Sequence, residues 1–431
     1  MSASLPPPDR SGSIAPVSRR CPQCGAEYAD QIAFCGNDGT ITIQVQPSGE
    51  APDPRLGVRL GEYVVVARVA DGAMGRVYEG RHVQSKQRVA IKILHDDVAR
   101  DRVAVERFKR EYETAKELDS AHVVRVIDFG EAPEIPGAAG RSWFMTMEYL
   151  QGVELGGLLR RGGRLPPARA LRVLAQVALG LDDAHSFGVI HRDLKPDNLF
   201  LCDTPSGDDV RILDFGSVKL QMETGPKLTA FGTTLGSPFY MSPEQAMGKQ
   251  DVDQRTDAFA LAAILYEMLT GKIAFEADAV AQILMKIVNE MPAPPSTQGA
   301  GLPAAMDDVI DKALAKDKRA RYGGVIELAQ AAFGAFGVPV PEGRAGIERW
   351  AKAPLAELEQ ALASATPPAP KPWGAPDAGP PATHPASQGD VLELSGGGKP
   401  RSNVALFVAL GVGALFVLGA IGLAALYLLF A

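Results

Sequence analysis

The chain has 431 residues, a net charge of −7 and a sequence pI near 5.5, and at roughly 150 residues per domain this length predicts two to three folded units. Because basic residues are not in excess, the charge excludes the usual electrostatic basis for nucleic-acid binding, and no nucleic-acid partner is expected. Four cysteines are too few for a disulfide scaffold of this size and fit a reducing cytosol.

Residues 1–20 are rich in proline and serine and predict a disordered leader, without the apolar core of a signal peptide. The next segment, residues 21–43, has the spacing of a zinc site. Cys21 and Cys24 can reach one ion from a single tight turn, and Cys35 begins a second turn in which Asp38 stands where a fourth cysteine is expected.

This segment resembles a short zinc ribbon that holds one structural Zn²⁺, with Asp38 or a water as the fourth ligand. The alternatives are a degenerate ribbon that folds without metal and a disordered segment with three free thiols. Residues 44–60 contain proline and glycine and predict a linker.

From Tyr63 onward the sequence predicts a strand, a glycine-rich turn and a second strand. Glycine lets a backbone approach phosphate groups closely, and Gly72 and Gly75 lie in this turn. The run V-A-I-K then places Lys92 on a strand, and Val98–Leu118 predicts a helix dense in alternating charge.

Two acidic residues stand at the mouths of a predicted hairpin. Its apolar strands are residues 199–201 and 210–213; Asp193 precedes the first, within H-R-D-L-K-P-D-N, and Asp214 follows the second, within D-F-G. Two carboxylates, the amide of Asn198 and the amine of Lys195 suit phosphoryl transfer, which depends on positioning and charge neutralisation. Asp193 could deprotonate a hydroxyl, Lys195 could neutralise the phosphoryl group, and Asn198 and Asp214 could bind Mg²⁺. The alternative is a polar loop whose side chains cap turns.

In this order, the motifs resemble those of a bacterial eukaryotic-like (Hanks-type) Ser/Thr protein kinase. The resemblance covers about Tyr63–Phe333, within a predicted kinase domain of residues 61–335, and implies an α+β bilobal fold with a small β-rich lobe and a larger helical lobe. A second D-F-G at residues 128–130 precedes the catalytic loop and predicts an ordinary strand that ends in a turn.

The resemblance implies that Lys92 binds the α- and β-phosphates of ATP and pairs with Glu111, with Glu106 and Glu113 as competitors on the same helix. Met147 would be the gatekeeper, and Glu148–Leu150 the hinge that binds the adenine. The full set of implied nucleotide-binding residues is Ala70, Gly72, Gly75, Val77, Ala90, Lys92, Met147, Glu148, Leu150 and Phe200. Ala70 replaces the first glycine of the family's loop, a departure expected to weaken nucleotide affinity or to slow the loop without abolishing binding.

The segment after Asp214 resembles an activation segment. Its threonines Thr229, Thr233 and Thr234 are candidate phosphorylation sites, although they could be simple polar loop residues. Arg192, directly before Asp193, could pair with such a phosphate and order the segment. Two further roles implied by the family are architectural: Glu244 pairs with Arg321, and Asp257 braces the catalytic loop.

The C-terminal part predicts a membrane anchor. Residues 343–365 include one amphipathic helix, and residues 366–402 are a Pro/Ala-rich disordered tether. Residues 404–431 carry no charge and exceed the roughly 20 residues that span a bilayer; a buried core helix is the alternative. Lys399 and Arg401 ahead of this segment favour a single-pass protein of the inner (cytoplasmic) membrane whose kinase domain faces the cytoplasm.

The expected function is that of a membrane-tethered, non-specific serine/threonine protein kinase. It would transfer the γ-phosphate of ATP, with Mg²⁺ or Mn²⁺, to Ser/Thr hydroxyls of proteins, including its own activation segment in trans in a dimer. One alternative is a pseudokinase or scaffold that binds nucleotide and partners without efficient transfer. Another gives the ribbon the main role, with the kinase as its output.

Overall fold

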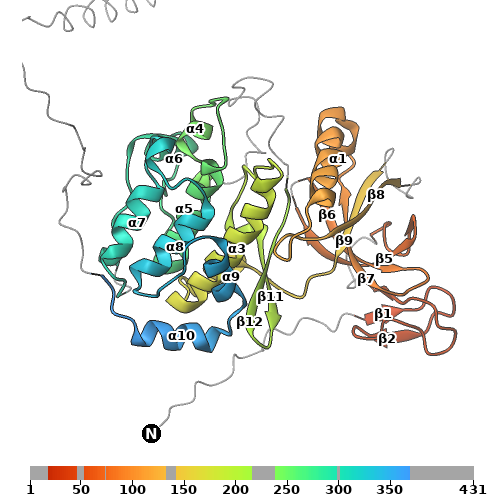
Figure 1. Ribbon diagram of the computed structural model, residues 1–431. Helices are drawn as coiled ribbons and strands as arrows, with labels where there is room; N and C mark the ends of the chain where they lie inside the picture. The colour runs from red at the N-terminus through yellow and green to blue at the C-terminus, as the bar shows by residue number, and fades with distance from the viewer. Residues whose placement is uncertain are drawn as a thin grey trace, which may run out of the picture. The chain divides into compact units, whose positions relative to one another are not determined.

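The computed structural model describes residues 18–45, 53–72, 74–132, 142–215, 238–298 and 301–368. The first three strands form a small antiparallel sheet of order β2-β1-β3, of which β1 and β2 are labelled in Figure 1. Their bounds are β1 Ser18–Arg20, β2 Glu27–Ala29 and β3 Ile43–Gln44. This sheet and its two turns form the ribbon, residues 18–44. The predicted leader of residues 1–20 therefore extends too far, because residues 18–20 form the central strand of this sheet. The rest of that leader lies outside the described residues.

A second sheet forms the smaller lobe of the predicted kinase domain, with the order β4-β5-β6-β7-β9-β8. Alternate residues of its strands pack into a cluster on one face that includes Tyr78, Ile91 and Phe144, as the period of two along a strand requires. The bounds are β4 Arg59–Leu60, β5 Tyr63–Asp71, β6 Gly75–His82, β7 Arg88–Leu94, β8 Val126–Ala132 and β9 Ser142–Glu148. The predicted linker of residues 44–60 thus ends within the sheet.

The helix expected at Val98–Leu118 divides into a short 3-10 turn, Val98–Arg100, and the helix α1, Arg102–Glu117. The break falls at Asp101, whose side chain accepts a hydrogen bond from Val103 N and so caps the helix. The early D-F-G lies inside β8, where Phe129 stacks on Trp143 at a centroid distance of 5.5 Å. It is a structural strand, as predicted.

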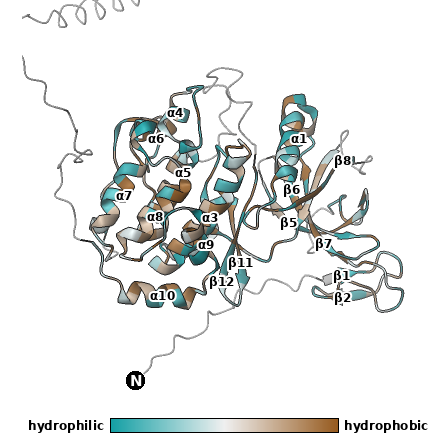
Figure 2. Ribbon diagram, viewed as in Figure 1, coloured by the Kyte–Doolittle hydropathy of each residue, from teal (hydrophilic) through white to brown (hydrophobic). Residues whose placement is uncertain are grey.

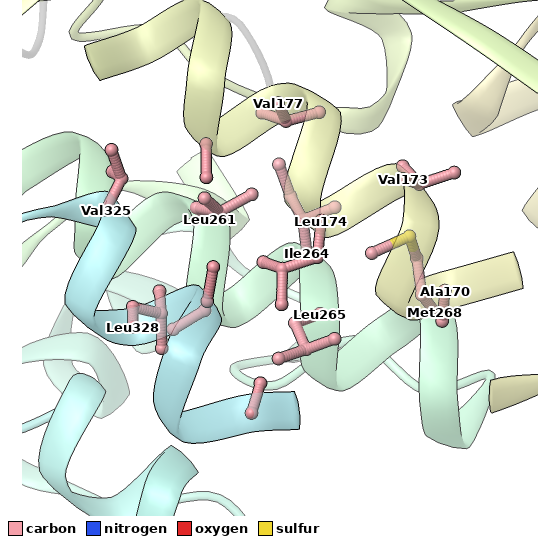
Figure 3. Packing of buried hydrophobic residues seen from close by; sticks show 14 of the residues in the cluster. Ala170, Val173, Leu174, Val177, Leu261, Ile264, Leu265, Met268, Val325 and Leu328 are labelled. Atoms are coloured by element: carbon pink, nitrogen blue, oxygen red, sulfur yellow. The ribbon is translucent and has the colours of Figure 1, made fainter. Parts of the chain in front are cut away.

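The larger lobe is helical around α3 (Pro167–Ser186) and α5 (Arg255–Thr270). Leu174 and Val177 of α3 lie beside Leu261 and Ile264 of α5 (Figure 3). Figure 2 shows α5 largely hydrophobic and α1 largely hydrophilic. The other α-helices of this lobe among the described residues up to residue 335 are α2 Leu155–Gly162, α4 Pro243–Ala246, α6 Val280–Asn289, α7 Ala305–Ala313 and α8 Val325–Ala335.

Most of α3 is buried around its whole circumference, including the polar Arg172 and Gln176. Other elements cover every face: α5 and α8 pack on α3 from the core, and later helices cover its remaining side. A helix enclosed in this way keeps few solvent-facing positions.

The domain continues past its predicted end at residue 335. Where one helix was expected in residues 343–365, there are two, α9 Arg344–Lys352 and α10 Leu355–Ser364. The two are separated at Pro354, the N-cap residue directly before the second helix. Both contact α3, and Trp350 of α9 is buried against Phe333 of α8. Arg172 joins the parts by donating to the carbonyls of Ser206, Asp208 and Ala353.

None of the helices in the described part of the chain is long and apolar enough to cross a membrane. The predicted membrane segment at 404–431 lies outside the described residues, as does the predicted tether from residue 369 onward.

Candidate active site

Lys92 lies at the centre of a charged triad between the two lobes. It extends from β7, and its Nζ lies 3.0 Å from Glu111 Oε1 and 2.8 Å from Asp214 Oδ1. Glu111 lies on the buried face of α1, one turn from Phe108 and Ala115, whereas Glu106 and Glu113 are exposed. The helical period therefore selects Glu111 among the three candidates.

Burial and charge act against one another in this triad. Burial alone would lower the pKa of Lys92, but the adjacent carboxylates of Asp214 and Glu111 raise it above its ordinary value. Burial raises the pKa of Asp214, but the Lys92 ammonium outweighs this effect and holds it below the usual range. Burial raises the pKa of Glu111, with Lys92 opposing this. The lysine therefore stays charged in a place from which water is largely excluded.

The catalytic loop is fixed from below by Asp257, in the first turn of α5. Its carboxylate accepts hydrogen bonds from His191 N at 2.8 Å, Arg192 N at 2.9 Å and His185 Nε2 at 2.8 Å. The predicted bracing contact is therefore present. Gln245 adds a hydrogen bond from its Nε2 to the Arg192 carbonyl, 2.6 Å long.

These contacts hold Arg192 at φ +66°, a left-handed backbone that non-glycine residues rarely adopt. Sequence analysis missed the role of Gln245. The S-P-E-Q run could have indicated it, because Ser242 and Gln245 form a capping box at the start of α4.

Asp193 and Asn198 face the site from the same loop. Asp193 Oδ2 lies 2.9 Å from Lys195 Nζ. The Asn198 Nδ2 donates to the Asp193 carbonyl at 2.8 Å, which leaves its amide oxygen as the atom that can bind a cation. Asp214 lies two residues after the end of β12 (Gly207–Ile212), the partner of β11 (Leu199–Thr204). Asn198 and Asp214 thus present oxygen atoms of the kind that Mg²⁺ prefers as ligands.

His191 links the two acidic motifs. Its Nε2 donates to the Leu213 carbonyl at 2.9 Å, its Nδ1 accepts from Asp193 N at 3.3 Å, and its ring meets Phe215 at 4.7 Å. The position of Asp193 is therefore coupled through one buried imidazole to the residue before Asp214.

The glycine-rich turn joins β5 to β6. A Cβ at Gly75 would lie 2.3 Å from the Ile93 carbonyl oxygen, so only glycine lets these strands pair as they do. Ala70 is exposed in β5, opposite Val77, and is not among the described non-glycine residues with positive φ. The backbone at Ala70 therefore does not require glycine, which weakens the reason to expect an impaired loop.

The residues implied to contact adenine lie on one face of the sheet and at the hinge. Val77 pairs across the strands with Lys92, and Ala90 with Met147. Glu148 and Leu150 follow at the end of β9, and Phe200 lies on β11 opposite Glu154 of β10 (Gly152–Glu154). The structure thus places Val77, Ala90 and Met147 on neighbouring strands, on the same face of the sheet as Lys92.

The architectural ion pair is confirmed. Arg321 Nη2 lies 2.7 Å from Glu244 Oε2, both buried, and Thr256 Oγ1 donates to the same carboxylate. The candidate phosphorylation sites Thr229, Thr233 and Thr234 lie outside the described residues.

The ribbon brings its four predicted ligands together. One ligand atom from each of Cys21, Cys24, Cys35 and Asp38 lies within 4.8 Å of the others. The two turns have matching hydrogen bonds: Gly25 N donates to Cys21 O as Gly39 N donates to Cys35 O, both at 3.0 Å. Asp38 therefore occupies in the second turn the position that Cys24 occupies in the first.

The thiols lie in a polar setting that suits metal binding. Cys35 Sγ accepts from Asn37 N and lies 3.0 Å from the Tyr28 hydroxyl. Burial opposes ionisation of Cys35, but these hydrogen bonds outweigh it and lower its pKa. A set of three sulfur atoms and one carboxylate fits tetrahedral zinc.

Comparison with known proteins identifies the family. Residues 63–333 match the protein kinase domain, and the chain therefore belongs to the protein kinase family. The chain is 37% identical over 288 residues to serine/threonine-protein kinase Pkn1 of Myxococcus xanthus, a match that covers 67% of this chain and 40% of Pkn1. It is 38% identical over 257 residues to PknB of Mycobacterium tuberculosis, covering 60% of this chain and 40% of PknB.

A solved structure shares the fold. The crystal structure of the Mycobacterium tuberculosis PknI kinase domain aligns with a TM-score of 0.50 at 29% identity, covering 64% of this chain and 97% of that domain. The bilobal kinase fold predicted from the motifs is thereby confirmed. The chain spans only about two fifths of the length of the two curated relatives named above.

Proposed function

We propose that this protein is a serine/threonine protein kinase that transfers the γ-phosphoryl group of Mg·ATP to protein hydroxyls. The observation that carries the proposal is the position of Lys92, whose Nζ contacts Glu111 and Asp214 at the same time. This contact links β7, α1 and the D-F-G motif beside the loop that carries Asp193. The names of the relatives, all serine/threonine-protein kinases, support the same activity.

The residues have distinct roles in this proposal. Asp193 accepts the proton of the substrate hydroxyl, and Lys195, 2.9 Å away, neutralises the transferring phosphoryl group. Lys92 binds the α- and β-phosphates. Asn198 and Asp214 would hold Mg²⁺, which would supply charge neutralisation at the phosphates.

The proposal includes a membrane anchor and self-phosphorylation. Residues 404–431 would hold the kinase at the cytoplasmic face of the inner membrane, since the segment is uncharged and follows two cations. Tethering raises the local concentration of copies, which favours phosphorylation of Thr229, Thr233 or Thr234 in trans. Arg192 would then form an ion pair with the phosphate on that threonine.

The ribbon would hold one structural Zn²⁺ through Cys21, Cys24, Cys35 and Asp38. The support is the donor set, within 4.8 Å, and the equivalence of the two turns. The metal would join the turns, as in other small domains whose folding depends on zinc.

The test compares the full chain with Asp193→Asn and Lys92→Met, using radiolabelled Mg·ATP and a generic basic protein substrate. Loss of the catalytic base should slow transfer by roughly 10²–10⁴-fold, while Asp193→Asn still binds nucleotide. Equal transfer by wild type and Asp193→Asn would refute the assignment. Nucleotide binding without transfer in the wild type would instead establish the pseudokinase alternative.

A further inference from the structure

The ribbon contacts the kinase domain through a buried carboxylate. Glu79, in the middle of β6, is 2% exposed. Its Oε2 lies 3.1 Å from Arg19 Nη2 of the ribbon and 3.0 Å from Arg88 Nη2 of β7, and its Oε1 lies 3.0 Å from Arg81 Nη2. A buried carboxylate is costly unless cations compensate it, and one of its three cations comes from the ribbon.

Glu79 lies on the face of the sheet that the proposed nucleotide site uses. Side chains two residues apart on a strand share a face, so Glu79 follows Val77, and it pairs across the strands with Ala90. Both of those residues are proposed adenine contacts. The ribbon therefore docks beside the adenine site, on the face opposite to the apolar cluster around Tyr78 and Ile91.

A chain of charged contacts continues from Glu79 to the hinge. Arg88, which shares Glu79 Oε2 with Arg19, places its guanidinium 3.6 Å from the centre of the Tyr149 ring. This distance is typical of a close cation–π contact. Tyr149 is the central residue of the hinge Glu148–Leu150. Three side chains thus connect the ribbon to the segment proposed to bind the base.

Both metal-ligand turns take part in this docking. Arg19 lies two residues before Cys21 and is also paired with Asp30 at 3.3 Å. Phe34, directly before Cys35, lies under the Arg81 guanidinium at 5.9 Å. A metal that joins the turns would therefore fix both contacts to the Glu79 cluster at once. A third contact, from Arg68 N of β5 to Gln44 Oε1, holds the end of β3.

We propose that the ribbon is a positioning element of the nucleotide site: zinc in the ribbon tightens ATP binding through Arg19, Glu79, Arg88 and Tyr149. The inference rests on the proposed kinase function and on zinc binding by the ribbon. Arg19 and Glu79 are not among the residues proposed to bind nucleotide or to take part in transfer, so we expect them to act on the affinity for ATP and not on the chemical step. A coupling of this kind is reciprocal, because each ligand must raise the affinity for the other by the same factor.

The experiment uses the full chain in detergent, zinc-loaded or stripped by a chelator and returned to Mg²⁺. Binding of Mg²⁺ with a non-hydrolysable ATP analogue is measured by calorimetry, and zinc affinity by competition with a chromophoric chelator. Zinc removal should weaken analogue binding roughly 5- to 10-fold, and the analogue should strengthen zinc binding by the same factor. Arg19→Ala should weaken analogue binding in the loaded protein and abolish its response to zinc, raising the KM for ATP with kcat unchanged.

Arg20→Ala is the matched control. Arg20 lies on the same strand, but it is exposed and pairs within the ribbon with Glu27 at 2.7 Å. This variant should keep both the affinity and the zinc response of the wild type. The conservative variant Glu79→Gln should reduce the change in analogue affinity that zinc causes, while the ribbon stays folded on the kinase domain.

Three results would overturn the inference, and they are distinguishable. The first result is a zinc-loaded wild type that binds one zinc but whose affinity for the analogue changes less than two-fold when the zinc is removed, and also when Arg19 is replaced by alanine. This result would refute the coupling while the kinase function stands. Absence of stoichiometric zinc in the purified chain, with analogue binding intact, would refute the metal's role. Absence of analogue binding in the wild type would refute the proposed function as well.

Discussion

Trp350 provides a direct test of whether the folded kinase unit extends past residue 335. This residue of α9 is 3% exposed and stacks on Phe333 with ring centroids 6.1 Å apart. Its indole Nε1 is buried without a hydrogen-bond partner among the described residues. Trp350→Ala should therefore lose the burial of a large aromatic group and leave a cavity between α9 and α8.

Large-to-small aromatic substitutions in a core cost about 3–5 kcal/mol. At roughly 2–4 °C per kcal/mol for a domain of this size, the melting temperature should fall by roughly 6–20 °C. Trp350→Phe should behave differently. It loses part of the buried area but also removes an unsatisfied N–H, whose burial costs about 1–3 kcal/mol, so its net change should be small.

The assay measures thermal unfolding of the full chain by differential scanning fluorimetry, with Phe187→Ala as the control. Phe187 is 62% exposed at the end of α3, so its loss should change the melting temperature little. The reasoning would be refuted if Trp350→Ala melted together with Phe187→Ala, because α9 would then not belong to the cooperative unit.

Two further predictions concern the ribbon and the larger lobe. Asp38→Cys should raise zinc affinity at least tenfold over wild type, and Asp38→Ala should lower it, in competition with a chromophoric chelator; equal affinities would show that residue 38 is not a ligand. Burial, with Arg321 nearby, lowers the pKa of Lys316 from its ordinary value of 10.5 to about 8. Between about pH 8 and pH 10.5, the unfolded chain therefore binds a proton at Lys316 that the folded chain has lost. For this reason Lys316 makes the free energy of unfolding rise with pH over this range. Lys316→Met should lack that rise, so the melting temperature of wild type relative to this variant should increase from pH 7.5 to pH 9.5; a constant difference would contradict the assignment.

The catalytic motifs could be predicted from the sequence because each is local. The loop from His191 to Asn198 and the hairpin leading to Asp214 carry their own turn and strand signals, and chain order separated Asp214 from the earlier D-F-G. Glu111 was implied by the family resemblance, with Glu106 and Glu113 left as competitors, and the buried face of α1 selects it. The spacing alone likewise predicted that Cys21, Cys24, Cys35 and Asp38 would lie together, as they do.

The features that sequence analysis missed depend on distant partners. Arg19 and Glu79 are 60 positions apart, and neither strand pattern indicates that a ribbon would cover part of the kinase sheet. The sequence also carries no sign that α3 is buried on all sides. Arg172 and Gln176 look like solvent-facing positions, but both side chains donate hydrogen bonds to carbonyls of the β11–β12 hairpin and of the segment before α10. Such pairings follow from packing and carry no local signal.

Phosphosite mapping on the full chain tests the central claim most directly. The wild type and Asp193→Asn would be purified from a host without other Ser/Thr kinases, incubated with Mg·ATP and analysed by mass spectrometry. We expect phosphate on Thr229, Thr233 or Thr234 in the wild type and none in Asp193→Asn. Phosphate at the same level in both, or in neither while nucleotide still binds, would contradict the assignment of this protein as an active kinase.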